Sequence, residues 1–455
     1  MTEENKTRPQ GLTFERVLTE DGVSPYNIDW ERRTARITDD KGETVFELEN
    51  AEVPESWSQL ATNVVASKYF RRAGSAGERE TSVCQIIDRV VGTIAEWGEA
   101  GGYFATKDDA RVFGDELTHI LVNQMATFNS PVWFNVGVEE SPQVSACFIN
   151  SVEDSMESIM ELAAVEASIF KGGSGSGTNL STLRSSREKL SSGGRPSGPV
   201  SFMRGYDAFA GVIKSGGKCR RSAVLRALDV EHPDIVEFID SKVEEEKKAW
   251  ALIDAGYDGG INGDAYGTVA FQNANNSVRV TDEFMNGAFH DWKYETKAVL
   301  DGQPIEELKA RDVLRRIAEA THVCGDPGLQ LHDTINRWHT CKDSGEIRCS
   351  NPCIEYNFLD DSACNLASLN LLRFLRDDGK IDIPRFLHVV DIMITAQDIL
   401  IDNARYPTEK IAKNSRNFRP LGLGFANLGA LLMVKGLPYD SDKARQWAAA
   451  ITALM

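Results

Sequence analysis

Long hydrophobic runs are absent from the sequence. No apolar stretch approaches the roughly 18 residues that a bilayer span requires. The first ten residues, MTEENKTRPQ, are polar and carry both charge signs, without the apolar stretch that follows the basic end of a secretory signal. The sequence therefore predicts a cytoplasmic protein without a membrane partner.

A surplus of positive charge is also missing. The chain has 50 Lys and Arg residues against 68 Asp and Glu residues, a formal net charge of -18. Such a surface repels nucleic-acid polymers, because their phosphates are negative. We expect no bulk DNA or RNA partner. A small anionic ligand remains compatible with this charge where basic residues gather locally.

Cysteine is scarce, with eight residues in 455. These are too few for a disulfide scaffold, so each is a buried thiol, a metal ligand or a redox group. We interpret Cys84, Cys219 and Cys324 as small buried apolar residues. For Cys341 and Cys349, a structural and a functional role both remain open. The cysteines and histidines of residues 322–353 contain no CxxC pair and fit no standard zinc spacing, so we expect no metal site.

The patterns that are present predict an α/β protein with a small, mainly helical N-terminal domain. Residues 1–12 are predicted to be disordered, residues 13–128 to form the helical domain and residues 129–455 to form the main domain. Apolar residues between Val83 and Ile94 recur at helical spacing. In the main domain, strand patterns alternate with helix patterns, as in α/β folds.

Particular elements follow from these patterns. We expect strands within 143–152 and 222–230, and helices over 156–170, 311–323 and 384–405. The run GGSGSG (172–177) is predicted to end a helix, and residues 184–199 to form a loop. The last residues, ARQWAAAITALM, stop inside an apolar helical pattern. This pattern predicts a shortened chain or completion by a second chain, with a natural C-terminal helix as the alternative.

The segment SNPCIE (350–355) carries the most chemistry. In an extended backbone, alternate residues share a face. Asn351, Cys353 and Glu355 would then point one way, with Pro352 and Ile354 opposite. A carboxylate beside a thiol disfavours the thiolate, because like charges repel. The arrangement is better suited to moving a hydrogen atom at sulfur while the carboxylate moves a proton.

Two further cysteines share a Ser-Ala-Cys context. Cys147 lies in SACFIN, and Cys364 lies in SACNLASLNL. Both segments have strand-like patterns, which suggests two thiols that face each other across a sheet. Such a pair can donate two electrons by closing a disulfide.

Together these motifs resemble the catalytic subunits of ribonucleotide reductases. NPCIE, the two SAC segments and FNSPVWFN (128–135) carry the resemblance, which covers the chain from about Trp57 onward. NPC in place of the NLC usual in the iron-dependent class points to the adenosylcobalamin-dependent class. The segments LIDNARYPTEKI (400–411) and NSRNFRPLGLGFANLGALL (414–432) point the same way.

The resemblance implies a ten-stranded α/β barrel, incomplete in this chain, with the radical cysteine on a loop inside it. It assigns the thiyl radical to Cys353, which takes the 3'-hydrogen from the ribose. It makes Glu355 the base on the 3'-hydroxyl, with Asn351 hydrogen-bonded to the same region. Cys147 and Cys364 become the reducing pair, which also protonates the leaving 2'-hydroxyl.

The resemblance also implies a ribonucleoside di- or triphosphate as substrate. It places Ser130 at the substrate phosphate, Ala146 and Cys147 at the ribose, and Gly175 where backbone meets substrate. The remaining substrate contacts are Asn351, Pro352, Cys353, Ile354 and Glu355. By itself GGSGSG could suggest a dinucleotide fold, but the preceding strand and following acidic residue are missing. A flexible linker is the other alternative.

A deoxynucleotide effector at a dimer interface is a further implication. It assigns Asp154 to the effector ribose, Arg184 to its phosphate, and Lys218 to the loop KSGGKCRRS (214–222) that couples effector to substrate choice. The alternative for this basic loop is an ordinary solvated surface. The family also implies a homodimer and a thioredoxin-type reductant. Residues 13–55 are too short for the family's ATP-binding activity module.

Two parts of the family pattern are expected after residue 455: a phosphate loop and the tail cysteines that re-reduce the Cys147–Cys364 pair. We therefore expect either a shortened chain or a split gene whose second product completes the barrel. One alternative function is an iron-dependent reductase with a partner radical subunit. The other is a non-catalytic nucleotide-binding homologue, against which the intact set of catalytic residues argues.

Overall fold

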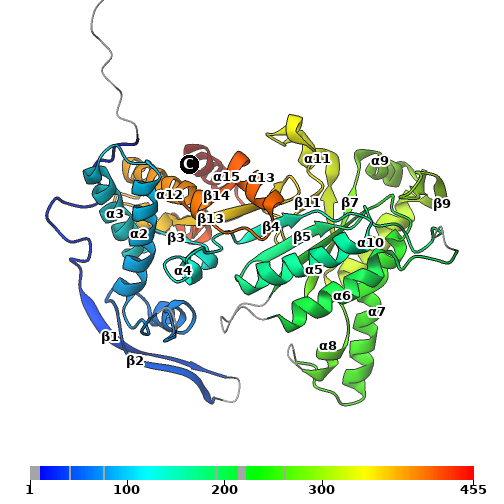
Figure 1. The fold of residues 1–455 in the computed structure, drawn as a ribbon, viewed down its shortest axis with the longest axis horizontal. Coiled ribbons are helices and arrows are strands. Elements are labelled where there is room, and N and C mark those ends of the chain that lie inside the picture. Colours follow the sequence, from blue (N-terminus) through cyan, green and yellow to red (C-terminus); the bar gives the residue numbers. More distant parts are fainter. Residues whose placement is uncertain (1–10, 40–41, 75–76, 190–192, 214–221, 261–262) are drawn as a thin grey trace, which may run out of the picture. The chain divides into compact units, whose positions relative to one another are not determined.

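The computed structural model describes residues 11–39, 42–74, 77–189, 193–213, 222–260 and 263–455. It divides into two units. The first comprises Met1–Ala146, Cys364–Tyr406 and Ser415–Met455, and the second comprises Cys147–Ala363 and Pro407–Asn414. The chain combines helices with a mainly parallel sheet and separate antiparallel hairpins (Figure 1), so the predicted α/β class is confirmed. The predicted domain boundaries stay predictions, and most of the predicted 1–12 tail lies outside the described residues.

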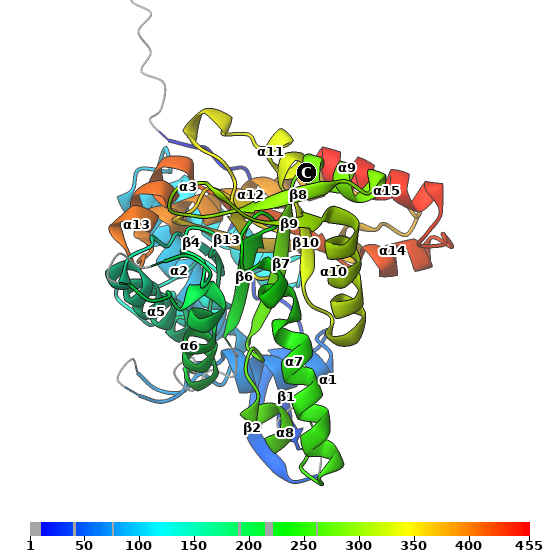
Figure 2. The same cartoon turned by 90° about the vertical axis from the view of Figure 1, so that its right-hand side faces the viewer.

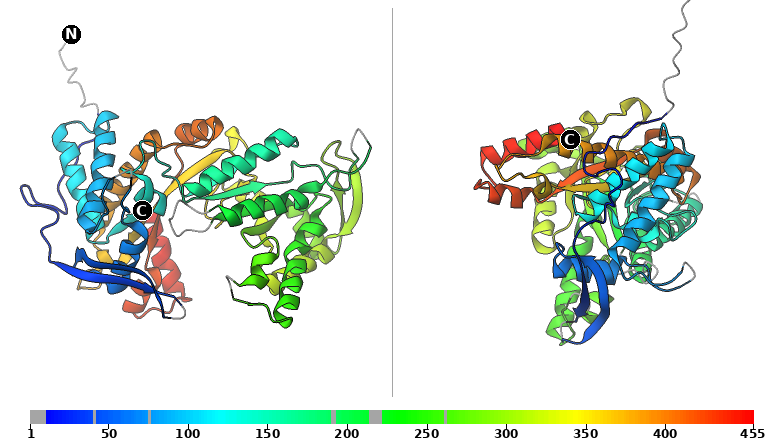
Figure 3. Two further views of the ribbon diagram at one scale, coloured as in Figure 1. Left: turned by 60° about the horizontal axis from the view of Figure 1, so that its bottom comes forward. Right: turned by 90° about the vertical axis from the view of Figure 1, so that its left-hand side faces the viewer.

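The first unit begins with a long antiparallel ribbon, drawn in dark blue in Figure 3. Strand β1 (Trp30–Thr38) pairs with β2 (Thr44–Pro54). A short α1 (Gln59–Val64) and a π-helical turn (Val65–Tyr69) follow. Only part of each strand is buried, because its exposed positions alternate with positions that face the unit.

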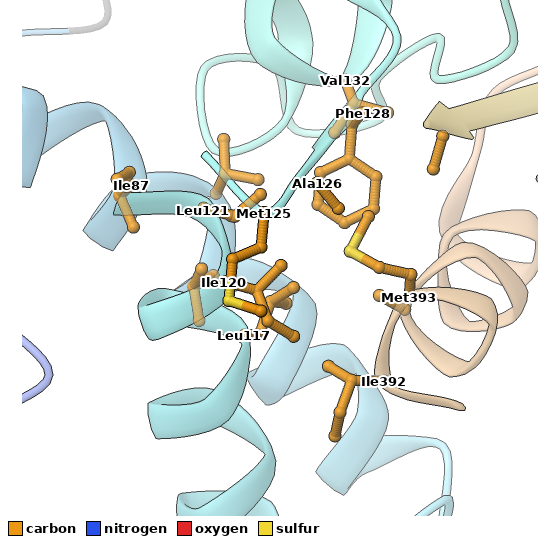
Figure 4. Packing of buried hydrophobic residues seen from close by; sticks show 14 of the residues in the cluster. Ile87, Leu117, Ile120, Leu121, Met125, Ala126, Phe128, Val132, Ile392 and Met393 are labelled. Atoms are coloured by element: carbon orange, nitrogen blue, oxygen red, sulfur yellow. The ribbon is translucent and has the colours of Figure 1, made fainter. Parts of the chain in front are cut away.

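Helices α2 (Val83–Ala100), α3 (Lys107–Val122) and α12 (Ile383–Asn403) enclose the core of the first unit. Ser82 starts α2 with a capping box that involves Gln85, which satisfies backbone N–H groups at the helix end. Figure 4 shows how the apolar faces meet; its labelled side chains include Ile87, Leu117, Ile120, Met125, Phe128, Ile392 and Met393. No helix in the described ranges is both long and apolar enough to cross a bilayer.

A small sheet completes the first unit. Strand β13 (Ser362–Asn370) pairs in antiparallel fashion with β3 (Ala126–Phe128) and in parallel with β14 (Leu421–Ala426). The remaining elements of this unit are α4 (Ser130–Asn135), a 3-10 turn (Leu371–Phe374), α14 (Leu428–Val434) and α15 (Asp442–Leu454). Helix α13 (Glu409–Phe418) begins in the second unit and ends in the first.

The second unit is built on parallel strands in the order β10-β7-β6-β5-β4. Their bounds are β4 (Cys147–Asn150), β5 (Gly175–Asn179), β6 (Ala223–Asp229), β7 (Ala274–Val280) and β10 (Gly328–Leu331). The helices are α5 (Met156–Lys171), α6 (Gly198–Val212), α7 (Ile235–Asp254), α8 (Asp264–Thr268), α9 (Asp282–His290), α10 (Ala310–Cys324) and α11 (His332–Arg337). Figure 2 shows β6 and β7 side by side, with α7 and α10 next to them.

Two hairpins and a short helical turn complete this unit. Strand β8 (Lys293–Lys297) pairs with β9 (Pro304–Lys309), and β11 (Cys349–Ser350) pairs with β12 (Asn357–Phe358). A 3-10 turn spans Lys342–Ser344. The hairpin of β11 and β12 carries the NPCIE segment at its tip, so its placement determines the candidate site.

Most of the predicted elements are confirmed: the strands are β4 and β6, and the helices are α5, α10 and α12. The prediction for GGSGSG is wrong in its second half. Gly172 caps α5, but β5 begins at Gly175 and runs fully buried to Asn179. Glycine and serine have low strand propensity, and β5 forms because β4 and β6 pair with it on both sides.

A buried carboxylate ties the start of the described chain to the helical core. Glu116 on α3 is fully buried and accepts hydrogen bonds from the backbone N–H groups of Leu18 (3.0 Å) and Thr19 (2.9 Å). The carboxylate also accepts from the Thr19 hydroxyl and lies 2.7 Å from His388 Nε2 on α12. Burial raises the pKa of Glu116, but the hydrogen bonds from His388 and Thr19 outweigh it and hold the pKa below its usual value.

Glu116→Gln should lower the free energy of unfolding by about 1–3 kcal/mol at neutral pH, because it leaves buried donors poorly paired. A depressed folded pKa contributes stability above the unfolded pKa of about 4.3 and loses it as pH falls through the folded value. Thermal unfolding between pH 3 and 7 should therefore show a shallower acid decline for the variant than for the unmodified protein. Parallel declines would contradict the assignment.

Candidate active site

The NPCIE segment is a tight turn at the tip of a hairpin. In β11 and β12, Cys349 pairs with Phe358 and Ser350 with Asn357. The Ile354 N–H donates to the Asn351 carbonyl oxygen at 3.1 Å, and Ile354 has a φ of 69°. The expectation of an extended backbone with Asn351, Cys353 and Glu355 on one face is therefore wrong. Asn followed by Pro is a common start for a β-turn, and that signal was present in the sequence.

Side-chain hydrogen bonds fix the turn. Asn351 Oδ1 accepts from the Tyr356 N–H at 3.0 Å, and the Asn351 N–H donates to the Tyr356 carbonyl at 3.1 Å. The Tyr356 hydroxyl donates to Ser362 Oγ at 2.7 Å. Asn275 on β7 donates to the carbonyl oxygen of Pro352 at 3.0 Å. The tip is thus held by its own amide and by a neighbouring strand.

The segment leading into the turn lies directly on β5. Asn179 Nδ2 donates to the carbonyl oxygen of Arg348 at 2.9 Å. A methyl group added at Gly177 would overlap the carbonyl oxygen of Ser350, and one at Gly175 would lie 3.0 Å from Pro352 Cγ. Residues 175, 177 and 179 therefore meet residues 352, 350 and 348 in turn. Only glycine permits this backbone approach at the middle contact.

Cys147, at the start of β4, lies beside this turn with only 5% of its surface exposed. Its thiol donates to Glu355 Oε1 at 3.3 Å, and Asn351 Nδ2 donates to the Cys147 sulfur at 3.1 Å. The structure therefore brings together three of the predicted catalytic residues: an amide, a thiol and a carboxylate. Cys353 is exposed at the tip of the same turn, whereas Asn351 and Pro352 are buried.

The fifth predicted catalytic residue, Cys364, belongs to the first unit. It is buried, and its carbonyl oxygen accepts from the N–H of Ala146 at 3.1 Å. Its thiol donates to the carbonyl oxygen of Asn365 at 3.3 Å. A methyl group at Gly422 on β14 would lie 3.6 Å from the Cys364 sulfur. Cys364 therefore neighbours the residue that immediately precedes Cys147 in the chain.

Of the other predicted substrate contacts, Ser130 is the first residue of α4 in the first unit. Its hydroxyl is 3.0 Å from the Tyr69 hydroxyl, and the Tyr69 ring stacks on Phe134 at 5.2 Å between centroids. Gly175 lies on β5 under Pro352 in the second unit. Ile354 follows the turn and is 37% exposed.

The predicted effector residues Asp154 and Arg184 form an ion pair in the second unit. Arg184 Nε lies 2.6 Å from Asp154 Oδ2, and the Arg184 N–H donates to Asp154 Oδ1 at 3.2 Å. The two side chains are 22% and 30% exposed, so an anion in solution could reach them. Lys218 and the rest of residues 214–221 lie outside the described residues.

The remaining cysteines differ in burial. Cys349 is fully buried, and burial raises its thiol pKa. Cys84 and Cys324 were predicted to be buried but are half-buried, and desolvation still raises the pKa of each. Cys341 is half-buried, and Cys219 lies outside the described residues. Within the described ranges, no three His, Cys, Asp or Glu side chains are grouped so as to hold a metal ion.

Comparison with known families agrees with this geometry. Residues 145–455 match the family model described as "Ribonucleotide reductase, barrel domain". The chain belongs to the ribonucleotide reductase family. Residues 31–124 match a second model, "Class II vitamin B12-dependent ribonucleotide reductase". The resemblance inferred from the sequence motifs and the predicted barrel type are thus confirmed.

Curated relatives of this reductase chain carry the name "Vitamin B12-dependent ribonucleotide reductase". The protein of Rhodopirellula baltica is 51% identical over 98% of this chain and 46% of the relative. Those of Streptomyces avermitilis and Streptomyces coelicolor are 53% and 54% identical, over 99% and 98% of this chain and 47% of each relative. The chain spans just under half the length of these relatives.

Sequence reasoning missed a buried polar cluster behind the candidate site. Glu166 on α5 binds Arg226 on β6 through two contacts, at 2.7 and 2.6 Å. Ser176 on β5 donates to Glu166 Oε1 at 2.8 Å and accepts from Asn150 on β4 at 2.7 Å. The available signal was Arg226 itself, a charged residue inside an otherwise apolar strand pattern.

Gly177→Ala should displace the hairpin of β11 and β12 and lower the free energy of unfolding by about 1–3 kcal/mol, because the added methyl overlaps the Ser350 carbonyl. Gly205→Ala is the matched control: Gly205 lies in α6 with open space around its Cβ position. The control should be neutral or stabilising by up to about 1 kcal/mol. Urea unfolding of both variants measures the difference, and equal stabilities would refute the close contact.

Proposed function

We propose that the protein reduces ribonucleotides to 2'-deoxyribonucleotides through a thiyl radical on Cys353, and that it depends on adenosylcobalamin. The observation that carries this proposal is the junction of Asn351, Cys147 and Glu355 beneath the exposed Cys353 turn. Membership in the reductase family and the names of the relatives support the same chemistry. The products would supply DNA synthesis and repair.

The roles follow from the atoms that each residue offers. The Cys353 sulfur takes the 3'-hydrogen atom, while the Glu355 carboxylate accepts the 3'-hydroxyl proton and Asn351 hydrogen-bonds the same region. The Cys147 thiol protonates the departing 2'-hydroxyl, which leaves as water. Cys147 and Cys364 together supply two electrons and one further proton, and they end as a disulfide. Cys353 returns the hydrogen atom to the 3'-carbon, and Glu355 returns the proton to the 3'-oxygen.

The position of Cys353 fits a cofactor that approaches from outside the hairpin. Its neighbours Asn351 and Pro352 are buried and hold the turn, while Cys353 is exposed. Adenosylcobalamin, when bound, supplies the radical that removes the hydrogen atom from the Cys353 thiol. The residues of this chain fix the turn and keep Cys147 away from water until substrate binds.

We further propose a ribonucleoside di- or triphosphate as substrate. Its phosphate would meet Ser130, its ribose Ala146 and Cys147, and its remaining contacts would be Gly175 and the turn from Asn351 to Glu355, which includes Pro352 and Ile354. A thioredoxin-type protein would re-reduce the disulfide, and the chain would act in the cytoplasm.

A dNTP effector would bind at Asp154, Arg184 and Lys218 in a homodimer. The ion pair of Asp154 and Arg184 supports such a site, because an effector can use both partners: its ribose hydroxyl meets the carboxylate and its phosphate meets the guanidinium. Effector and substrate binding would then be coupled reciprocally in free energy.

Cofactor dependence can be measured directly. Reduction of ribonucleotides by the intact enzyme should require adenosylcobalamin, and it should need no iron-containing partner subunit. The assay compares dNTP or dNDP formation with and without the cofactor, over both substrate phosphorylation levels. Equal product in the two arms would refute the dependence.

Two cysteine variants separate the radical from the reducing pair. Cys353→Ser should abolish reduction yet leave nucleotide binding intact, because the O–H bond of serine is much stronger than the S–H bond of cysteine, so the radical does not form at this position. Cys147→Ser should permit loss of the 3'-hydrogen but halt before product. Product analysis with 3'-tritiated substrate tests both steps, and product formation by Cys353→Ser would overturn the radical assignment.

A further inference from the structure

We infer that the buried ion pair of Glu166 and Arg226, acting through Ser176, positions the NPCIE turn against Cys147. Glu166 and Arg226 are thus positioning residues of the site. This inference rests on the proposed function for the meaning of the positioned site. The contacts themselves are observed among residues of the second unit and do not depend on that function.

Both faces of strand β5 make contacts on which the inference depends. On one face, Gly175, Gly177 and Asn179 meet the segment from Arg348 to Pro352. The side chain of Ser176 points to the opposite face, because successive residues of a strand alternate. There it lies between Glu166 on α5 and Asn150 on β4. Figure 1 shows α5 beside these strands.

The cluster links β5, on which the turn lies, to its two neighbouring strands. Arg226 on β6 pairs across the sheet with Thr178 of β5, and Asn150 on β4 pairs with the same residue from the other side. Glu166 binds Arg226 with both oxygens and Ser176 with one, so a single carboxylate ties β5 to β6. Asn150 extends this link to β4, the strand that carries Cys147.

The ion pair is fully enclosed. Arg226 is 1% exposed and Glu166 is 2% exposed. The Arg226 guanidinium also lies over the Tyr206 ring, 4.8 Å from its centroid, and the Tyr206 hydroxyl donates to the Ile159 carbonyl on α5 at 3.0 Å. Each group of the pair therefore has a fixed partner, which defines one arrangement of α5, α6, β5 and β6.

Stability alone gives little reason for such a pair. Removing two charges from water costs several kcal/mol per ion, and apolar residues of similar volume are often at least as stabilising. What apolar residues do not supply is directional bonding. The bonds among Glu166, Arg226 and Ser176 fix the position of β5 in the sheet. Because Gly177 has no side chain, the backbone of β5 contacts Ser350 directly, so the position of β5 determines that of Ser350.

A shift of β5 would therefore reach the reacting groups. Ser350 is directly followed by Asn351, whose amide lies 3.1 Å from the Cys147 sulfur. A displacement of a few tenths of an ångström at Gly177 is enough to lengthen this contact and the 3.3 Å contact between Cys147 and Glu355. The inference predicts a change at Cys147 when the cluster is replaced, even where overall stability is kept.

The test replaces the pair by apolar residues of similar volume, Glu166→Leu with Arg226→Met, in the intact protein. The melting temperature should stay within a few degrees of the original value. Alkylation of Cys147 by iodoacetamide, followed by peptide mass spectrometry, should become faster by about tenfold, because a loosened turn exposes the buried thiol more often.

Ser176→Ala provides a second variant that leaves the ion pair intact but cuts its link to β5. It should accelerate alkylation in the same direction, and it keeps the inference testable if the double variant does not fold. The matched control is Glu80→Leu with Arg89→Met, which removes another buried pair (3% and 7% exposed) in the first unit. This control should leave Cys147 reactivity unchanged.

An unchanged alkylation rate for Cys147 in Ser176→Ala and in the folded double variant would overturn the inference. Because alkylation and melting require no turnover, the result is independent of the reductase assay. Product formation by Cys353→Ser would refute the proposed function but not the positioning role of Glu166 and Arg226. Unaltered alkylation of Cys147 would refute that positioning role but not the proposed chemistry.

Discussion

The approach of one backbone to another at Gly177 is the constraint on which the candidate site depends. The carbonyl oxygen of Ser350 occupies the space that any side chain at position 177 would fill. Because this contact joins two backbones without an intervening flexible side chain, the position of β5 determines the position of the turn that follows Ser350. Asn351, Cys147 and Glu355 meet at hydrogen-bonding distance because the strand beneath them is bare.

Burial divides the cysteines around this contact into different chemical roles. Cys349 and Cys353 are four residues apart on the same hairpin. Cys349 is fully buried and its pKa is raised by desolvation, which keeps it a neutral thiol, whereas Cys353 is exposed at the tip. Cys147 lies between these extremes, buried but bonded to an amide and a carboxylate. The hairpin therefore presents one thiol outward and keeps another inert.

Buried charge is used to locate segments. Arg279 on β7 is 2% exposed and binds Gln330 on β10, His332 on α11 and the carbonyl oxygen of Ile347. That carbonyl lies just before the segment that rests on β5. Arg226 and Glu166 secure the neighbouring strands β5 and β6 from the opposite face of the sheet. Directional bonds at both faces thus determine where an irregular turn lies, which apolar packing alone does with less precision.

The sequence by itself determined the α/β class, the elements with strong periodicity, the family, and the residues at which the chemistry gathers. These follow from local patterns and motifs, which can be recognised in the sequence without knowledge of contacts between distant segments. The strand β5, the turn at Pro352 and the cluster of Glu166, Ser176 and Arg226 were not predicted. Glycine and serine are poor strand formers, so β5 exists only because β4 and β6 pair with it. The contact between the Glu355 carboxylate and the Cys147 thiol was likewise decided by tertiary structure. The turn reverses the chain, and a shift of one residue moves a side chain to the other face.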